Sequence, residues 1–402
     1  MIDSSTNALS HLLRSALGTQ SAEGLPVDVD WQKVIDLSFD QGVAAIAVDG
    51  LSKVEGFGST GSPTGNEALE LLDSPELEDL KYEWFGEVMR SEDDYRLQVE
   101  AISSLARTYA QSGISMMLLK GYGLGLNYPI PQHRPTGDID IFLNDNDDDN
   151  DNCGRLPAWK CGDEIIRKMG IKVDSGHEHH TTFQFQGPHS LRQAQGKLGS
   201  GQVMVENHYD FINTKAHRDA PRIEAKLKEL ASRECREHLM PDGTRILLPS
   251  ADFNVIFLIR HLGQHFAGEH ICLRQILDYG LFLQKEGGSV HWSELVPLIK
   301  EMGIWTFFNQ INAICEDYLG LHLDGIPAIE RNEELERRII EDVLHPEFAE
   351  EKPSGLIPVL AFKVRRWWHN RWKHPLVYDE WLLPMLLTLA WSHLRRIKTI
   401  KD

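Results

Sequence analysis

The most constraining feature of the sequence is a short stretch in which acidic and apolar residues alternate, Asp138-Ile139-Asp140-Ile141. Successive side chains of a β-strand point to opposite faces, so both aspartates are predicted on one face and both isoleucines in the core. Two neighbouring carboxylates repel each other unless a partner neutralises them. Mg²⁺ removes that repulsion because it binds a few carboxylate oxygens together with substrate phosphates. The pattern predicts a metal–phosphate site, with the solvent face of an alternating strand as the alternative.

The residues before this strand favour the phosphate interpretation. An apolar run, Met116–Leu119, predicts a buried strand that ends in a tight turn at Lys120-Gly121, followed by a short helix-like segment. Backbone N–H groups in such a turn can hold an anion. Arg134, in the loop that follows, carries a guanidinium that can bind two phosphate oxygens at once.

The order LLKG, short helix, RPTGDIDIF resembles the core of the DNA-polymerase-β-type nucleotidyltransferase superfamily. It resembles most closely the bacterial group labelled uncharacterised nucleotidyltransferases. The resemblance implies an NTP substrate and Mg²⁺ or Mn²⁺ as cofactor, with Asp138 and Asp140 as metal ligands and Gly137 beside the nucleotide. Lys120-Gly121 stands where many members have Gly-Ser, so backbone amides would have to replace the serine's contact with phosphate.

The same resemblance implies a third acidic residue on a later strand. The segment Gln202–His208 consists of apolar residues followed by Glu206, Asn207 and His208. The close group has an acidic residue followed two positions later by a histidine, and Glu206 and His208 match that pattern. Glu206 is the candidate third metal ligand, and His208 a candidate contact to carboxylate or phosphate. The alternatives are a surface glutamate and a partly buried structural histidine.

The pattern of elements predicts an α+β fold. A small mixed β-sheet with helices on one face forms the nucleotidyltransferase core, between helical N-terminal and C-terminal regions. We predict three parts: residues 1–112, 113–215 and 216–402. From Pro221 onward the periodicity predicts helices almost to the end, including one over Ala220–His238 and one that begins after Ser250 as its N-cap. Polar segments at 55–66 and 144–154 predict loops.

Composition limits the partners and the location of the chain. Of 402 residues, 41 are basic and 60 acidic, and the net charge of −19 argues against bulk binding of nucleic acid or an anionic membrane. No run approaches the roughly 20 apolar residues of a membrane span, and the first residues do not resemble a signal peptide. The five cysteines show no CxxC spacing and indicate no disulfide framework. We therefore expect a cytoplasmic protein.

Two further motifs offer alternatives. His177–His180 reads HEHH, which suggests zinc, but consecutive positions on a strand do not converge, so we expect a strand entry near the active cleft instead. Lys363–His374 interleaves basic and aromatic residues, as RNA-binding segments do. A core-packed helix with Arg and Lys stems reaching solvent is the other interpretation.

The leading hypothesis is a Mg²⁺-dependent nucleotidyltransferase that moves a nucleoside monophosphate from an NTP to an unidentified acceptor: a small molecule, a sugar, a protein or tRNA. Asp138, Asp140 and Glu206 would be the catalytic metal ligands, and Lys120, Gly121 and Arg134 would contact phosphate. The alternatives are a non-catalytic nucleotide-binding or regulatory member, a toxin-like enzyme that modifies tRNA, and a metal-dependent hydrolase built on the histidines.

Overall fold

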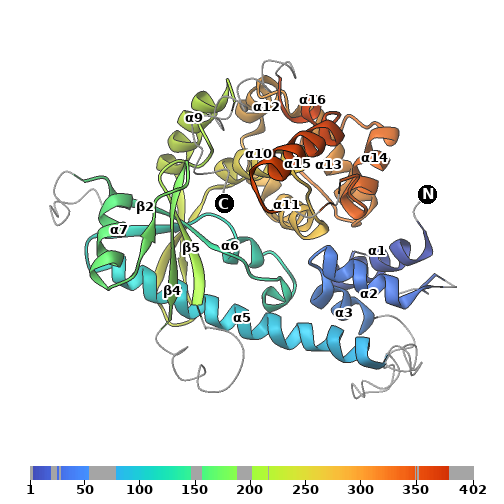
Figure 1. The fold of residues 1–402 in the computed structure, drawn as a ribbon, viewed down its shortest axis with the longest axis horizontal. Helices are drawn as coiled ribbons and strands as arrows, with labels where there is room; N and C mark the ends of the chain where they lie inside the picture. Colours follow the sequence, from blue (N-terminus) through green and yellow to red (C-terminus); the bar gives the residue numbers. More distant parts are fainter. Residues whose placement is uncertain are drawn as a thin grey trace. The chain divides into compact units, whose positions relative to one another are not determined.

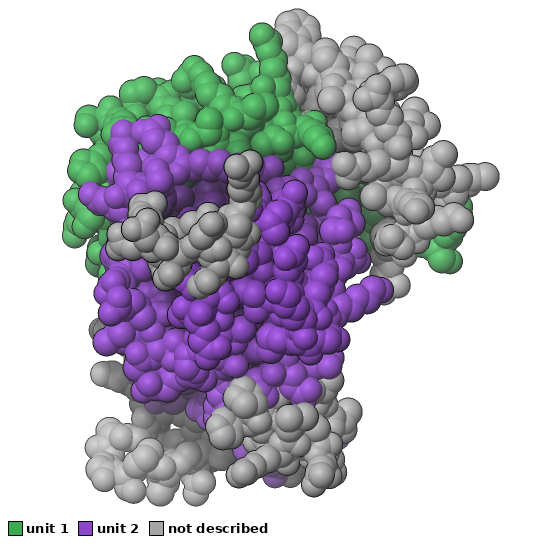
Figure 2. Space-filling model, turned by 90° about the vertical axis from the view of Figure 1, so that its left-hand side faces the viewer, with its two compact units in different colours: residues 1–2, 212–227, 254–402 green, residues 3–211, 228–253 purple. Residues whose placement is uncertain are grey.

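The structure is a computed structural model. It describes residues 3–19, 25–26, 29–53, 78–145, 156–187, 202–215, 217–348, 350 and 353–379. The chain forms two compact units (Figure 2): residues 1–2, 212–227 and 254–402 in one, and residues 3–211 and 228–253 in the other. The predicted boundaries at 112 and 215 stay predictions. The predicted loops at 55–66 and 144–154 fall wholly or largely outside the described residues.

Helices open the larger unit, as the periodicity predicts. They are α1 (Ser4–Leu17), α2 (Trp31–Asp40), α3 (Ala44–Leu51) and the long α5 (Glu78–Ala110). Asp3 and Asp30 cap α1 and α2, because their carboxylates accept hydrogen bonds from the N–H groups of Thr6 and Lys33. The indole of Trp84 on α5 donates a hydrogen bond to the carbonyl of Ala44 on α3. That bond ties the first helices to α5.

A seven-stranded mixed sheet forms the centre of the larger unit (Figure 1). Its spatial order is β3 (Val173–Asp174), β4 (His180–Gln186), β5 (Gln202–His208), β2 (Ile139–Asp145), β1 (Ile114–Leu118), β7 (Arg245–Pro249) and β6 (Cys235–Leu239). β2 runs parallel to β5 and antiparallel to β1, and β4 runs antiparallel to β5. These pairings bring strands from distant parts of the chain to the middle of the sheet.

The core lies on one face of this sheet, between the strands and the helices α5 and α7 (Ala158–Lys168). Alternate residues of β2, Ile139 and Ile141, are buried there with Val205 of β5. Residues from both helices belong to the same buried cluster, for example Leu105 of α5 and Ile166 of α7. The predicted α+β class, with a mixed sheet and helices on one face, is confirmed. Asp140 of β2 consequently shares the other face with Glu206 and His208 of β5, whereas Asn207 lies on the core face, where its amide donates a hydrogen bond to Asp163 of α7 at 2.9 Å.

One part of the prediction is wrong: the chain is not helical throughout from Pro221. Helix α9 (Ala220–Arg233) is followed by the hairpin β6–β7, with Cys235 paired to Pro249. β7 joins the sheet beside β1, where Met117 pairs with Leu247. The charged residues of β6 suit an edge strand, which explains why its sequence reads as an amphipathic helix.

The smaller unit is helical. Its helices are part of α9 (Ala220–Arg233), most of α10 (Ala251–Gly268), α11 (Leu273–Glu286), α12 (Trp292–Glu301), α13 (Trp305–Asp317), α14 (Glu333–Leu344), α15 (Leu356–Asn370) and the short α16 (His374–Val377). Ser250 caps α10 as predicted, because its hydroxyl accepts a hydrogen bond from the N–H of Phe253 at 3.3 Å. None of the helices in the described residues is long and apolar enough to cross a membrane.

Cys161 on α7, in the larger unit, is disulfide-bonded, which the scattered cysteines did not predict.

Candidate active site

The turn after β1 depends on a glycine. Gly121 has φ 58° and ψ −111°, a backbone conformation that residues other than glycine rarely adopt. The carbonyl of Lys120 accepts a hydrogen bond from the N–H of Gly123 at 3.2 Å. This is the geometry of a type II′ turn with glycine at its second position. The short helix α6 (Tyr122–Gly125) follows directly. The turn lies beside the strand entry of β2, since a Cβ on Gly121 would be 3.6 Å from the carbonyl oxygen of Asp138.

A Gly121→Ala variant is expected to lose about 1–3 kcal/mol of unfolding free energy, because alanine is strained at this positive φ. Urea unfolding of the full chain measures the loss. Gly137→Ala is the matched control, since Gly137 has an ordinary φ and no atom within 4 Å of the added Cβ. Equal stability of the two variants would contradict the described turn.

The three predicted acidic residues lie where the start of β2 runs beside the last residues of the parallel strand β5. Asp138 immediately precedes β2, Asp140 is its second residue, and Glu206 pairs with Asp140 across the parallel strands. Asp140, Glu206 and His208 each offer one ligand atom, and these atoms lie within 4.8 Å of one another. Asp138 is exposed, whereas Asp140 is buried. The structure thus brings Asp140 and Glu206 together, with Asp138 at the solvent-exposed edge of this acidic cluster.

Positive groups surround the buried aspartate. The Lys120 ammonium lies 2.9 Å from Asp140 Oδ1, and His208 Nε2 lies 3.1 Å from the same oxygen. Burial alone would raise the pKa of Asp140, but the charge of Lys120 and the His208 hydrogen bond hold it well below its usual range. The pKa of His208 is raised: burial opposes protonation, but its bonds to Asp140 and Glu206 outweigh that effect.

Asp138 has the opposite electrostatic situation. Its pKa is raised by desolvation, and further by the negative charges of Glu206 and Asp140, with Lys120 opposing the shift. A carboxylate is harder to ionise there because two others are already close. This repulsion is the electrostatic condition that a bound cation relieves.

Gly137 and Arg134, the remaining predicted residues, hold the loop that leads into β2. The carbonyl of Gly137 accepts a hydrogen bond from Gln98 Nε2 of α5 at 3.0 Å. Arg134 is buried, donates to the carbonyl of Pro135 at 3.0 Å, and packs its Cδ beside Gly125 of α6. These contacts position the loop. Gln98 was not predicted, because no motif distinguishes one polar residue within a long helix.

His133, in the same loop, ties the site to the N-terminal helices. Its Nδ1 lies 2.8 Å from Asp49 of α3, and its Nε2 lies 3.3 Å from Glu92 of α5. The hydrogen bond to Asp49 raises the pKa of His133, and this outweighs the lowering effect of burial.

This raised pKa predicts that stability depends on pH. The folded pKa lies above the ordinary value of 6.5, so the contribution is fully present below pH 6.5 and is lost as pH rises through the folded pKa. The wild type should therefore lose more thermal stability than a His133→Gln variant over that window. At pH 6 the variant should be less stable by about 2 kcal/mol, the worth of a hydrogen bond to a charged group. Parallel stability–pH curves for the two proteins would contradict the assignment.

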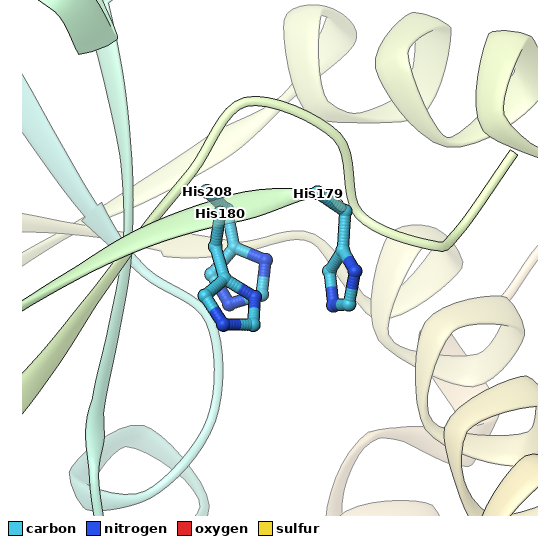
Figure 3. A group of neighbouring side chains, drawn as sticks. All are labelled: His179, His180 and His208. Carbon is cyan, nitrogen blue, oxygen red and sulfur yellow. The ribbon is translucent and has the colours of Figure 1, made fainter. Parts of the chain in front are cut away.

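The prediction that the consecutive histidines of the HEHH segment do not converge is wrong for His179 and His180. His179, His180 and His208 offer ring nitrogens within 4.8 Å of one another, and Figure 3 shows their rings on the same side of the chain. The strand β4 begins only at His180, so the alternation of a strand does not govern His179. Burial lowers the pKa of His179 to about 3 and that of His180 to about 4. Both imidazoles are neutral at neutral pH.

The sequence pattern of a family described as uncharacterised nucleotidyltransferase matches residues 27–320, most of the chain. The chain belongs to this family. Among solved structures it is similar to an antigenic nucleotidyltransferase-like protein from Paracoccidioides brasiliensis, with 13% identity and a TM-score of 0.34 over 58% of this chain and 97% of that one. No curated protein shows a significant match in sequence.

The basic and aromatic segment of this family member lies mainly on α15, in the smaller unit. Several of its basic groups have acidic partners: Arg365 lies 2.6 Å from Glu350, and Lys373 lies 2.5 Å from Asp342. Lys373 and Asp342 are both buried. A basic group that already forms an ion pair attracts phosphate less strongly, so these contacts do not favour the tRNA-modifying alternative.

Proposed function

We propose that the chain is a divalent-cation-dependent nucleotidyltransferase that moves a nucleoside monophosphate from an NTP to an acceptor hydroxyl or phosphate. The acceptor oxygen attacks the α-phosphorus, and a hydroxyl acceptor gives up its proton to solvent. The bond from that phosphorus to the oxygen shared with the β-phosphate breaks, and pyrophosphate leaves with the bonding electrons. The observation that carries the proposal is the pairing of Asp140 with Glu206 on adjacent parallel strands, with Asp138 at the rim. Membership of the nucleotidyltransferase family supports the same reaction class.

The residues present fit a hard divalent cation. Carboxylate oxygens are the donors that Mg²⁺ and Mn²⁺ prefer. The pKa of Asp138 is raised first by desolvation and then by the negative charges of Glu206 and Asp140, and a cation would relieve that repulsion. Asp138, Asp140 and Glu206 would hold it. When bound there, a cation would neutralise charge on the triphosphate and would lower the pKa of the attacking oxygen.

The chain's own residues supply the other parts of the reaction. Lys120 is the first residue of the glycine turn, and its ammonium lies 2.9 Å from Asp140, where its charge can stabilise phosphate oxygens. The backbone N–H groups of the Gly121 turn take the place of the serine contact. His208 holds Asp140 in position with its Nε2, while its Nδ1 lies 3.2 Å from the carbonyl of Asp210.

A screen of the four NTPs tests the proposal directly. The purified full chain is incubated with each NTP in Mg²⁺ or Mn²⁺, and pyrophosphate release and label transfer to the chain or to added acceptors are measured. The proposal expects release that depends on the cation and stops with a chelator. Retained NTP binding with no release under any of these conditions would instead support a non-catalytic nucleotide-binding member.

A further inference from the structure

Three histidines form a cluster that the nucleotidyltransferase reaction does not use as a whole. His180 begins β4 and pairs across the sheet with His208 at the end of β5. His179 directly precedes β4, and Figure 3 shows its ring directed to the same side as the other two. One nitrogen from each ring lies within 4.8 Å of the others. Two adjacent strand ends thus bring three imidazoles to one point.

The spacing of the rings suits a single transition-metal ion. The ring centroids are 4.5 Å apart for His179 and His180, 5.1 Å for His180 and His208, and 5.6 Å for His179 and His208. Tetrahedral zinc with Zn–N bonds of about 2.0–2.1 Å would place the centroids of two imidazole ligands about 5 Å apart. The observed separations lie on both sides of that distance.

Buried ring nitrogens in this cluster lack hydrogen-bond partners. Both nitrogens of His180 and Nδ1 of His179 are buried without a partner, and only 7% of His180 is exposed. An unpaired buried polar atom loses the hydrogen bond that it would make to water, so it is unfavourable in the folded protein. Glu206, whose Oε1 lies 3.6 Å from His180 Nε2, is too distant for a hydrogen bond. A bound cation would satisfy these nitrogens.

The third histidine already has the partners that metal-bound histidines usually have. His208 Nε2 lies 3.1 Å from Asp140, and Nδ1 lies 3.2 Å from the carbonyl of Asp210. Whichever nitrogen binds a cation, the other remains beside an oxygen acceptor to which it can donate. Such a bond orients the ring and strengthens the ligand.

We propose that His179, His180 and His208 form a site for one imidazole-preferring divalent cation of the zinc class, adjacent to the carboxylate site and distinct from it. Imidazole ligands select Zn²⁺, Co²⁺ and Ni²⁺, whereas Mg²⁺ prefers carboxylates and water. Three protein ligands leave a fourth position for water or a substrate oxygen. The nucleotidyltransferase would then present two neighbouring cation sites of different chemistry, with His208 at their boundary.

Cobalt titration in the absence of nucleotide tests this site. The full chain is stripped of metal with a chelator, and Co²⁺ is added while its visible absorption is recorded. We expect one Co²⁺ per chain with the intense bands of a four-coordinate site, displacement by Zn²⁺, and no displacement by an approximately hundredfold excess of Mg²⁺. X-ray absorption at the cobalt edge of the wild type should show three imidazole ligands. Displacement by Mg²⁺, or no binding, would overturn the proposal.

Substitutions assign the ligands. His179→Gln and His180→Gln should each weaken Co²⁺ binding by more than about 100-fold, since losing even an outer-shell partner costs 10–100-fold. The matched control is His177→Gln, because His177 is exposed and stacks on His180 at 4.5 Å but lies outside the group of three. Its Co²⁺ affinity should match the wild type. Wild-type affinity in either of the first two variants, with circular dichroism confirming the fold, would reject the site.

The test separates this inference from the proposed function. Asp138→Asn removes a proposed carboxylate ligand but none of the three histidines, so it should keep Co²⁺ binding. A wild type that binds Co²⁺ through imidazoles and releases no pyrophosphate from any NTP upholds the cation site and rejects the transferase. A wild type that releases pyrophosphate but binds no Co²⁺ upholds the transferase and rejects the cation site.

Discussion

An Asp138→Asn variant is expected to lose nucleotidyl transfer by about a thousandfold or more while keeping the stability of the wild type. The asparagine is nearly isosteric, but its neutral oxygen binds a divalent cation weakly, and metal catalysis contributes several kcal/mol. About 4 kcal/mol corresponds to a thousandfold change in rate. Stability should not fall, because Asp138 is exposed and its charge is repelled by Glu206 and Asp140.

The measurement compares pyrophosphate release and thermal unfolding in the same preparations. Asp93→Asn is the matched control, since Asp93 is exposed on α5 and pairs only with Arg96 at the surface among its described contacts. Such surface pairs contribute less than about 1 kcal/mol. Asp140→Asn should lose transfer and also stability, because it removes the anion beside the buried His208 and the partly buried Lys120. Transfer at the wild-type rate in Asp138→Asn would remove this aspartate from the site.

The sheet could be predicted only where local periodicity agrees with the tertiary structure. The alternation around Ile139 and Ile141 specifies the strand and its buried face. The hairpin β6–β7 was not predicted, because the residue pattern of its charged edge strand fits an amphipathic helix as well as a strand. The turn Pro241-Asp242-Gly243, where Gly243 has φ 80°, was the available indication. Such turn chemistry outweighs periodicity in a short strand.

The same limit applies to the candidate site. The positions of Asp138, Asp140 and Glu206 follow from strand patterns, but the register that places Asp140 opposite Glu206 is set by pairing between distant strands. The convergence of His179 with His180 depends on an irregular backbone before β4, which no periodicity predicts. The bond from Gln98 to the Gly137 loop likewise depends on tertiary packing.

A Gly50→Ala variant is expected to destabilise the larger unit by more than about 3 kcal/mol. A Cβ at Gly50 on α3 would lie 1.8 Å from the carbonyl oxygen of Leu12 on α1, and a backbone atom cannot rotate away. Overpacking in a well-packed core typically costs about 1–3 kcal/mol, and a clash with backbone exceeds that range because α1 and α3 must separate. The displacement would also move Asp49, the partner of His133 in the loop before β2.

Guanidinium unfolding of the wild type and the variant measures this loss, with Gly86→Ala as the matched helical control. Gly86 lies within α5 and has no atom within 4 Å of an added Cβ, so alanine there should stabilise the helix by about 0.5–1 kcal/mol. The two variants should therefore change stability in opposite directions. Asp49 raises the pKa of His133, and this raised pKa makes the wild type less stable as pH rises. In Gly50→Ala, stability should therefore fall less with rising pH than in the wild type. An unchanged unfolding midpoint in Gly50→Ala would show that α1 and α3 do not pack as closely as described.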